Sequence, residues 1–222
     1  MQAIVFDLDG TLVETAPDLH LVLGEVMQTQ GLDAPPLSAV HGMIGDGARV
    51  LLERALGAAG EERSQDELDR LYADFIDRYT REPCRASHLY DGVITALEGL
   101  RAQGARLAVC TNKPQRPSEL LLEALEVAQY FDAIVGGDAL DVRKPHPGHL
   151  QAALDRMQGD RDDAVMVGDS RNDLLTARAL GVPCILVSFG YTTVPARELG
   201  ADRVIDRFDE LGQALNEVRQ GA

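Results

Sequence analysis

Short apolar runs that alternate with helical patterns are the feature that most limits how this chain of 222 residues can fold. Five runs have the character of strands: residues 3–6, 106–110, 133–135, 164–167 and 184–187. Apolar residues at helical spacing stand before and between the later runs, at residues 93–100, 118–125, 149–157 and 173–180. Strands that alternate with helices of this length predict βαβ units, and hence a parallel sheet covered on both faces. We therefore expect an α/β fold with a Rossmann-like, three-layer core.

The stretch from residue 15 to residue 88 has a different pattern. It contains no convincing strand, but apolar residues recur at helical spacing over residues 19–27 and 68–79. Ser64 followed by Glu67 is a capping-box sequence that begins a helix, and Pro35-Pro36 separates two helices. We therefore predict an all-helical domain over residues 15–88, inserted into a core formed by residues 1–14 and 89–222. The two connections would lie side by side and could act as hinges.

The charge balance limits the partners of the chain. Acidic residues outnumber basic ones by 36 to 21, which gives a net charge of −15. This disfavours nucleic acid, because lysine and arginine contacts with phosphates supply most of that affinity. No apolar run is long enough to span a membrane, and the three cysteines lack the spacing of a metal site. We expect a cytoplasmic protein that binds neither nucleic acid nor membranes, and the sequence leaves monomer and homodimer open.

Polar residues follow directly after the predicted strands. They are Asp7 and Asp9 after the first run, Thr111, Asn112 and Lys113 after the second, Lys144 in a loop after the third, and Asp169 and Asp173 after the fourth. Because the carboxyl ends of parallel strands meet at one edge of a sheet, we expect these side chains to converge. Four clustered carboxylates repel one another unless a cation is bound, and an oxygen-rich site suits Mg²⁺. The sequence therefore predicts a magnesium site at this edge.

Four motifs occur in order at these strand ends: Asp7-Leu8-Asp9-Gly10-Thr11, Thr111-Asn112-Lys113-Pro114, Lys144-Pro145-His146-Pro147 and Gly168-Asp169-Ser170-Arg171-Asn172-Asp173. Together they resemble the motifs of the haloacid dehalogenase (HAD) superfamily of hydrolases, and more narrowly those of its phosphoglycolate phosphatase branch. The resemblance covers the whole chain. It implies a Mg²⁺-dependent phosphatase whose helical insertion is a cap of the C1 type.

The resemblance also implies a role for each acidic residue. Asp7 would attack phosphorus and form an aspartyl-phosphate. Asp9 would protonate the leaving alkoxide and then deprotonate the water that clears the intermediate. The Asp7 carboxylate, the Asp9 backbone carbonyl and the Asp169 carboxylate would ligate Mg²⁺. Asp173 would orient metal-bound water from the second shell of ligands, and the alternative for it is a helix cap.

Further residues would bind the phosphoryl group. Thr111 and Lys144 would hold its oxygens, and Lys144 would also offset the negative charge of Asp7. Asn112 would add an amide contact. For Lys113 a contact with substrate and a solvated side chain remain equally open.

Two features of the sequence separate the activities within the superfamily. Chloride leaves without a proton but an alkoxide needs one, so Asp9 favours phosphoester hydrolysis over carbon–halogen cleavage. Residues 15–88 contain no lysine, which excludes the Schiff-base chemistry of related phosphonate hydrolases. Another small phosphate ester such as a sugar phosphate, pyrophosphate, or a mutase similar to β-phosphoglucomutase stays open. A signalling receiver domain would be shorter and would lack the insertion.

The turn at Gly45-Asp46-Gly47-Ala48-Arg49 enters a helix of the predicted cap. Its backbone amides could meet an anion, and Arg49 could bind the carboxylate of 2-phosphoglycolate with both arms of its guanidinium. The alternative is an ordinary helix start with Arg49 in solvent. The negative charge of Asp46 weakens the argument for an anion site unless Asp46 pairs with Arg49. We expect 2-phosphoglycolate, a small phosphorylated metabolite, as the substrate.

Overall fold

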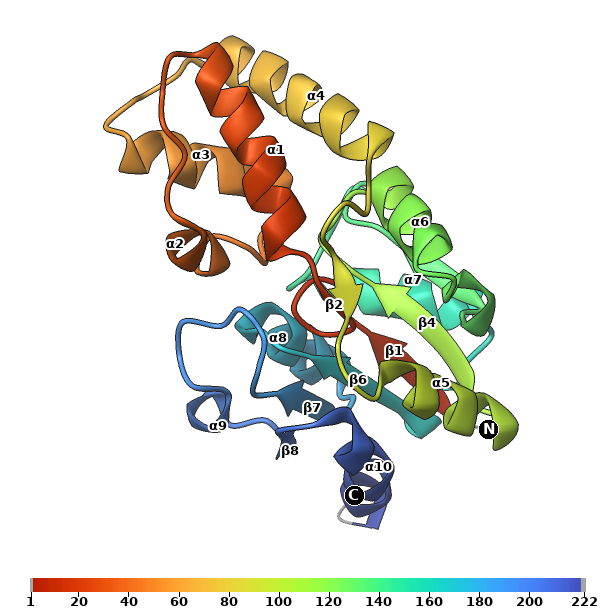
Figure 1. The fold of residues 1–222 in the computed structure, drawn as a ribbon. Coiled ribbons are helices and arrows are strands. Elements are labelled where there is room, and N and C mark those ends of the chain that lie inside the picture. The colour runs from red at the N-terminus through yellow and green to blue at the C-terminus, as the bar shows by residue number, and fades with distance from the viewer. Residues whose placement is uncertain (1, 221–222) are drawn as a thin grey trace.

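The computed structural model describes residues 2–220. A six-stranded sheet forms its centre, in the order β5-β4-β1-β6-β7-β8, and all neighbouring strands in it run parallel (Figure 1). The strands are β1 (Ala3–Phe6), β4 (Arg106–Cys110), β5 (Ala133–Val135), β6 (Ala164–Gly168), β7 (Cys184–Val187) and β8 (Arg203–Ile205). The predicted α/β class is therefore confirmed, with the five predicted strands in the same sheet.

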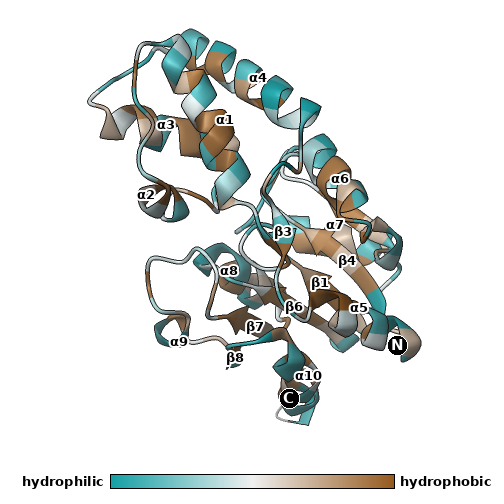
Figure 2. Ribbon diagram, viewed as in Figure 1, coloured by the Kyte–Doolittle hydropathy of each residue, from teal (hydrophilic) through white to brown (hydrophobic). Residues whose placement is uncertain are grey.

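Helices cover both faces of this sheet because its side chains alternate in direction. Ile4 and Phe6 of β1 pack on the face covered by α5 (Val93–Ala102), α6 (Gln115–Ala124) and α10 (Leu211–Gln220). Ala3 and Val5 pack on the opposite face, against α7 (Pro147–Arg156) and α8 (Arg171–Leu180). Both faces are buried, and the central strands β1 and β6 are apolar along their whole length (Figure 2). This burial fixes the strand ends that carry the polar motifs.

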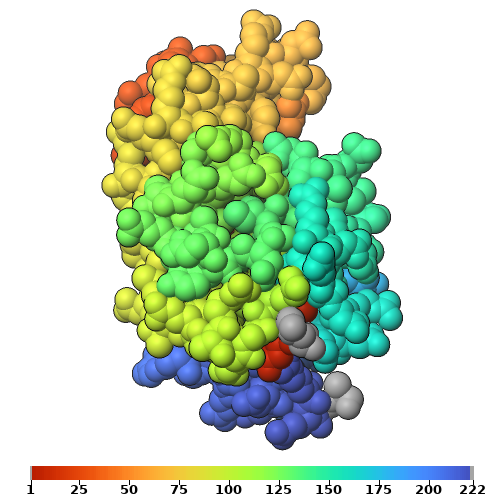
Figure 3. All heavy atoms as spheres, turned by 90° about the vertical axis from the view of Figure 1, so that its right-hand side faces the viewer, coloured from red at the N-terminus to blue at the C-terminus, as the bar shows by residue number. Residues whose placement is uncertain are grey.

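Four helices form a separate layer above the carboxyl edge of the sheet (Figure 1). They are α1 (Ala16–Thr29), α2 (Leu37–His41), α3 (Ala48–Ala58) and α4 (Gln65–Arg81), and they enclose an apolar cluster of their own. Ser64 and Glu67 form the predicted capping box at the start of α4, with Ser64 N–H donating to Glu67 Oε2 at 3.0 Å. The helix α4 also packs against α6 of the core (Figure 3).

The two chain segments that join this helical layer to the core lie side by side. The strands β2 (Val13–Glu14) and β3 (His88–Leu89) pair antiparallel, and the sequence pattern does not reveal either of them. The buried carboxylate of Asp18 accepts hydrogen bonds from the backbone N–H groups of residues 85–87, at 2.8–2.9 Å. These bonds tie the start of α1 to the chain that returns from α4.

Smaller elements complete the chain. They are α9 (Ala196–Leu199) and the short 3-10 helices η1 (Ala128–Tyr130), η2 (Arg161–Asp163) and η3 (Phe208–Glu210). The sequence pattern did not lead us to predict β8 or α10. The strand β8 is difficult to recognise because it is a three-residue edge strand that begins with the exposed Arg203. Within residues 2–220, no helix combines the length and the apolar character needed to cross a membrane.

Candidate active site

The carboxyl ends of β1, β4 and β6 bring the predicted polar residues to one place. The carboxylate of Asp7 follows β1 and accepts a hydrogen bond from the Leu8 backbone N–H at 2.7 Å. The ammonium of Lys144, which comes from the loop between β5 and α7, lies 2.8 Å from Asp7 Oδ1. Both side chains are buried. A carboxylate and an ammonium group from distant parts of the sequence therefore meet as predicted.

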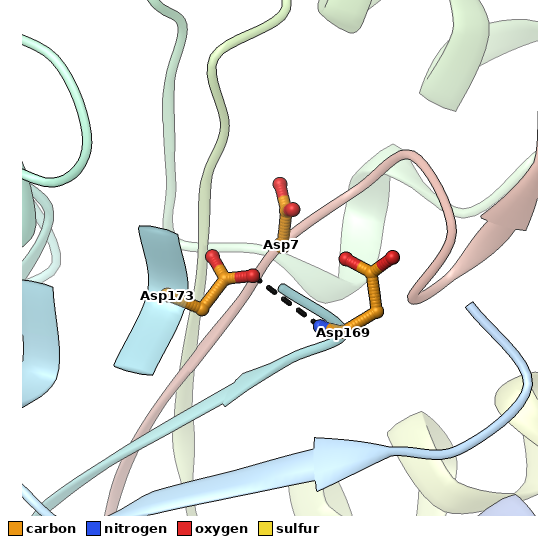
Figure 4. A group of neighbouring side chains, drawn as sticks. All are labelled: Asp7, Asp169 and Asp173. Atoms are coloured by element: carbon orange, nitrogen blue, oxygen red, sulfur yellow. Dashed lines mark hydrogen bonds between the residues drawn. The ribbon is translucent and has the colours of Figure 1, made fainter. Parts of the chain in front are cut away.

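Asp7, Asp169 and Asp173 form a cluster of buried carboxylates (Figure 4). One oxygen from each lies within 4.8 Å of the others. The Lys144 ammonium also contacts Asp173 Oδ1, at 2.6 Å, so that it bridges two members of the cluster. The other oxygen of Asp173 accepts hydrogen bonds from Ser170 Oγ at 2.6 Å and Ser170 N–H at 3.0 Å. Asp173 thus caps α8 and also belongs to the cluster.

Two glycines allow the chain to pass close to Asp169. Gly10 has a left-handed φ of +80°, and a Cβ atom there would lie 2.6 Å from Asp169 Oδ2. A Cβ atom at Gly190 would collide with the same side chain. The Tyr191 backbone N–H donates to Asp169 Oδ2 at 2.6 Å, which fixes the carboxylate in this narrow space. Gly10 of the first motif therefore leaves room for the Asp169 carboxylate, which any side chain at this position would push away.

The cluster holds more negative charge than its one lysine balances. Burial raises the pKa of Asp7 from 3.8 to about 7, although the Lys144 ammonium acts in the opposite direction. Burial and the neighbouring Asp7 also raise the pKa of Asp169 well above its ordinary value. Burial alone would lower the pKa of Lys144, but Asp173 and Asp7 hold it above its usual value. Three oxygen ligands with excess negative charge are a donor set that fits a hard divalent cation.

The carboxylate of Asp9 does not belong to this cluster and pairs with the other lysine. Lys113 Nζ lies 3.0 Å from Asp9 Oδ1 and 4.2 Å from the centroid of the Tyr79 ring in α4. Lys113 is buried, so the alternative of a solvated side chain is wrong. Burial alone would lower its pKa, but Asp9 and Tyr79 hold the pKa above the ordinary value. A charged lysine therefore stands beside the residue predicted to be the acid and base.

Thr111 and Asn112 follow β4 at the same edge and are also buried. The Asn112 side-chain NH₂ donates to the backbone carbonyls of Gly45, at 3.0 Å, and Lys144, at 3.1 Å. Both donors of this amide are therefore engaged, and a contact with a phosphoryl oxygen would require one of them to be released. In the structure Asn112 links the Lys144 loop to the helical layer.

A pocket opens beside Asp7 and Asp9, between the sheet edge and the helical layer. Its core side consists of Asp7, Asp9, Thr111, Asn112, Lys113, Pro114 and Pro117, and its other side of Leu19, Ile44, Gly45, Gly47, Ala48, Leu51, Phe75, Ile76 and Tyr79. Sequence reasoning missed the contribution of α4, because Phe75 and Tyr79 have the spacing of ordinary core residues. The pocket is charged at its floor and mostly apolar at its roof.

Arg49 is not among the residues that line this pocket. Its guanidinium pairs with Asp69 and donates to Gln65 Oε1 at 2.8 Å, both at the start of α4. Asp46 does not pair with Arg49. Instead it pairs with Arg54 and accepts a hydrogen bond from the Asn172 side chain at 2.7 Å. The structure thus does not bring Arg49 to the site, and a contact with substrate would require Arg49 to leave Asp69.

Comparisons with known proteins agree with this geometry. Residues 4–187 match the family described as haloacid dehalogenase-like hydrolase. The chain is 44% identical over 211 residues to a phosphoglycolate phosphatase of Caulobacter vibrioides, which covers 95% of this chain and 89% of that protein. It is also similar to the crystal structure of a predicted phosphoglycolate phosphatase from Haemophilus somnus, with a TM-score of 0.89 and 32% identity over 96% of this chain and 97% of the other.

A variant of CbbY from Rhodobacter sphaeroides, in complex with xylulose-(1,5)bisphosphate, has a TM-score of 0.82 and 26% identity, with 97% of this chain and 99% of that chain covered. The family match spans most of the sheet and all four motifs, and the identity to the Caulobacter protein extends over nearly the whole length. The chain therefore belongs to the haloacid dehalogenase-like hydrolase family and is one of its phosphatases, as the motifs indicated.

Proposed function

We propose that this phosphatase hydrolyses 2-phosphoglycolate to glycolate and phosphate, through an aspartyl-phosphate on Asp7 and with Mg²⁺ as its cofactor. The observation that carries the proposal is that Asp7 and Asp9 line one pocket, each with its own lysine, at 2.8 Å for Lys144 and 3.0 Å for Lys113. The Caulobacter relative bears the name phosphoglycolate phosphatase. The substrate is a small cytoplasmic metabolite, and no nucleic acid or membrane takes part.

The buried carboxylate cluster supports the choice of cofactor. The Asp7 and Asp169 carboxylates and the Asp9 backbone carbonyl would hold the ion, and Asp173 would position the Lys144 ammonium and the ligands around it. Bound there, Mg²⁺ would offset the negative charge of the phosphoryl group. The excess of carboxylates over ammonium groups in the cluster is the feature of this chain that fits a divalent cation.

The protein groups divide the hydrolysis into two displacements at phosphorus. A carboxylate oxygen of Asp7 attacks phosphorus, and the ester oxygen of glycolate leaves with a proton from Asp9. Asp9 then takes a proton from water, whose oxygen attacks phosphorus and releases Asp7 and inorganic phosphate. Lys144 and Thr111 hold the phosphoryl oxygens throughout. The proton that Asp9 gives in the first step thus returns to it in the second.

We also propose that residues 15–88 act as a cap domain over a core of residues 1–14 and 89–222. The helical layer supplies the roof of the pocket, and its Gly45 carbonyl accepts a hydrogen bond from the core residue Asn112 at 3.0 Å. A closed cap would exclude bulk water from the aspartyl-phosphate and admit only small substrates. The paired strands β2 and β3 would be its hinge.

Replacing Asp9 by asparagine tests the acid–base assignment. We expect Asp9→Asn to lower kcat for 2-phosphoglycolate by about 10²–10⁴-fold, because both displacements lose their proton carrier. The loss is expected to be smaller for an aryl phosphate, whose phenolate leaves without a proton. Phosphate release measured for both substrates checks this. An equal loss for the two would contradict the role of Asp9 as the acid.

A panel of small phosphate esters tests the substrate. We expect kcat/KM for 2-phosphoglycolate to exceed that for sugar phosphates and for pyrophosphate in a phosphate-release assay. The second candidate is a larger phosphorylated sugar, which the CbbY complex with xylulose-(1,5)bisphosphate suggests. A higher kcat/KM for any sugar phosphate would replace the proposed substrate with that class. Transfer of phosphate between two positions of a sugar, without release, would indicate a mutase.

The raised pKa of Asp7 predicts how the gain in stability from Mg²⁺ depends on pH. The pKa of Asp7 is about 7 in the folded state rather than 3.8, so the protonated carboxyl contributes favourably to the free energy of unfolding. This contribution is complete below pH 3.8 and is lost as the pH rises through about 7. The metal-free protein is therefore destabilised at pH 8, where Mg²⁺ binds the ionised carboxylates. We expect saturating Mg²⁺ to raise Tm by about 5–10 °C at pH 8 and by much less at pH 5.

Thermal unfolding with and without Mg²⁺ at both pH values measures this gain. Asp169→Asn is the control, because it removes one of the ligand carboxylates and is expected to abolish the gain at pH 8. Asp141→Asn is the matched substitution at an exposed carboxylate outside the pocket and is expected to leave the gain unchanged. A gain that is equal at the two pH values would contradict binding at the cluster.

A further inference from the structure

The Tyr79 hydroxyl is a buried donor without an acceptor. Tyr79 is 1% exposed and lines the pocket from the last turns of α4. Within residues 2–220 the proton of this hydroxyl finds no acceptor, because the neighbouring Lys113 ammonium can only donate to the hydroxyl oxygen. An unmade hydrogen bond of a buried hydroxyl destabilises a protein, so native structures rarely contain one without a reason. This hydroxyl would be satisfied by a ligand that brings an acceptor into the pocket.

The charge around Tyr79 indicates what kind of acceptor fits. Lys113 is the one basic residue among the described residues that line the pocket, and its Nζ lies 4.2 Å from the centroid of the Tyr79 ring. Burial raises the pKa of Tyr79 to about 12, so the phenol keeps its proton at neutral pH. A neutral hydroxyl donor beside an ammonium group is a pair that suits an anionic oxygen.

The position of Lys113 indicates which part of the substrate would carry this anionic oxygen, namely the leaving group. In the proposed mechanism Asp9 protonates the ester oxygen, and Lys113 Nζ lies 3.0 Å from Asp9 Oδ1. In 2-phosphoglycolate a single methylene separates the ester oxygen from the carboxylate carbon. The carboxylate would therefore lie next to Asp9, within reach of the lysine and the tyrosine. The side chains of the remaining roof residues, such as Leu19, Leu51 and Phe75, are apolar, so these side chains offer no hydrogen-bond partner to the hydroxyls of a sugar.

We propose that the Tyr79 hydroxyl and the Lys113 ammonium together bind the carboxylate of the substrate. Through Tyr79, α4 would then contribute to the specificity for the leaving group. This inference rests on the proposed function and extends it. The substrate class is a short aliphatic phosphate ester with a carboxylate one carbon from the ester oxygen. The inference assigns to Tyr79 and Lys113 the role that the sequence analysis predicted for Arg49.

The test compares 2-phosphoglycolate with ethyl phosphate, which replaces the carboxylate by a methyl group. Tyr79→Phe removes only the hydroxyl and keeps the ring against Lys113 and Phe75. We expect it to lower kcat/KM for 2-phosphoglycolate by about 10–100-fold, mainly through KM, and to change the value for ethyl phosphate by less than about twofold. Its Tm is expected to equal or exceed that of the wild type, because an unsatisfied buried hydroxyl is removed.

Tyr72→Phe is the matched control, since Tyr72 lies two turns earlier on α4 and does not line the pocket. It is expected to leave both kcat/KM values unchanged. If the wild type prefers 2-phosphoglycolate and Tyr79→Phe keeps this preference, the inference is overturned and the proposed function stands. An equal loss for both substrates also overturns it, since the tyrosine would then act only on the position of Lys113. A wild type without the preference overturns both.

Discussion

Replacing Asp7 by asparagine is expected to abolish phosphate release from every phosphate ester. The amide of asparagine has nearly the shape of the carboxylate but is not a nucleophile, so no aspartyl-phosphate forms. Loss of a nucleophile that starts a covalent mechanism lowers kcat by about 10⁴-fold or more. Phosphate release from 2-phosphoglycolate with Mg²⁺ measures the loss. Mass spectrometry of acid-quenched enzyme is expected to show a phosphorylated species for the wild type and none for the variant.

The fold of this variant should survive, which separates a chemical loss from a structural one. Burial raises the pKa of Asp7, so its ionised form opposes folding at neutral pH, and asparagine removes that charge. Lys144 keeps a partner, because Asp173 Oδ1 lies 2.6 Å from its Nζ. The metal-free variant is therefore expected to unfold at a Tm no lower than that of the wild type. Appreciable hydrolysis by folded Asp7→Asn enzyme would refute the nucleophile assignment.

The arrangement of the sheet and its carboxylate cluster could be predicted because both follow from general rules. Strands buried on two faces read as apolar runs, and parallel strands place their carboxyl ends at one edge. Asp7 and Asp169 stand at the ends of β1 and β6, which are neighbours in the sheet, so their meeting does not depend on loop details. The edge strand β8 could not be predicted from the sequence, because it is short and partly exposed.

The pairing of Lys113 with Asp9 could not be predicted in the same way. The resemblance implied that Lys144 offsets the charge of Asp7, but only the conformation of the loop after β4 decides that Lys113 contacts Asp9. Arg49 was predicted to contact substrate because its turn enters a helix, yet Asp69 on the neighbouring helix offers it a closer partner. Tyr79 gave no signal, since a tyrosine at helical spacing reads as part of the core. Contacts between helices of the helical layer therefore limit what the sequence alone reveals.

Replacing Lys144 by methionine is expected to destabilise the protein as well as inactivate it. Methionine keeps much of the side-chain volume but leaves the buried carboxylates of Asp7 and Asp173 without the ammonium that bridges them at 2.8 and 2.6 Å. Removing one partner of a buried ion pair lowers the free energy of unfolding by about 3–5 kcal/mol. In a chain of this length this corresponds to a fall in Tm of roughly 6–20 °C. The activity is expected to fall by about 10²–10³-fold or more, because the phosphoryl oxygens lose a fixed positive charge.

The pH dependence of this loss identifies its cause. The Lys144 ammonium lowers the pKa of Asp7, so without it that pKa rises further above its ordinary value of 3.8. At pH 5 the Asp7 carboxyl of this variant is then protonated and neutral, so its burial destabilises the fold little. The loss in Tm appears as the pH rises toward 8 and Asp7 must ionise. Lys113→Met is the matched substitution at the other buried lysine. Its partner Asp9 lies outside the carboxylate cluster, so Mg²⁺ is expected to restore Tm in Lys144→Met but not in Lys113→Met. A Tm loss in Lys144→Met that is independent of both pH and Mg²⁺ would mean that packing, rather than charge, explains the burial of Lys144.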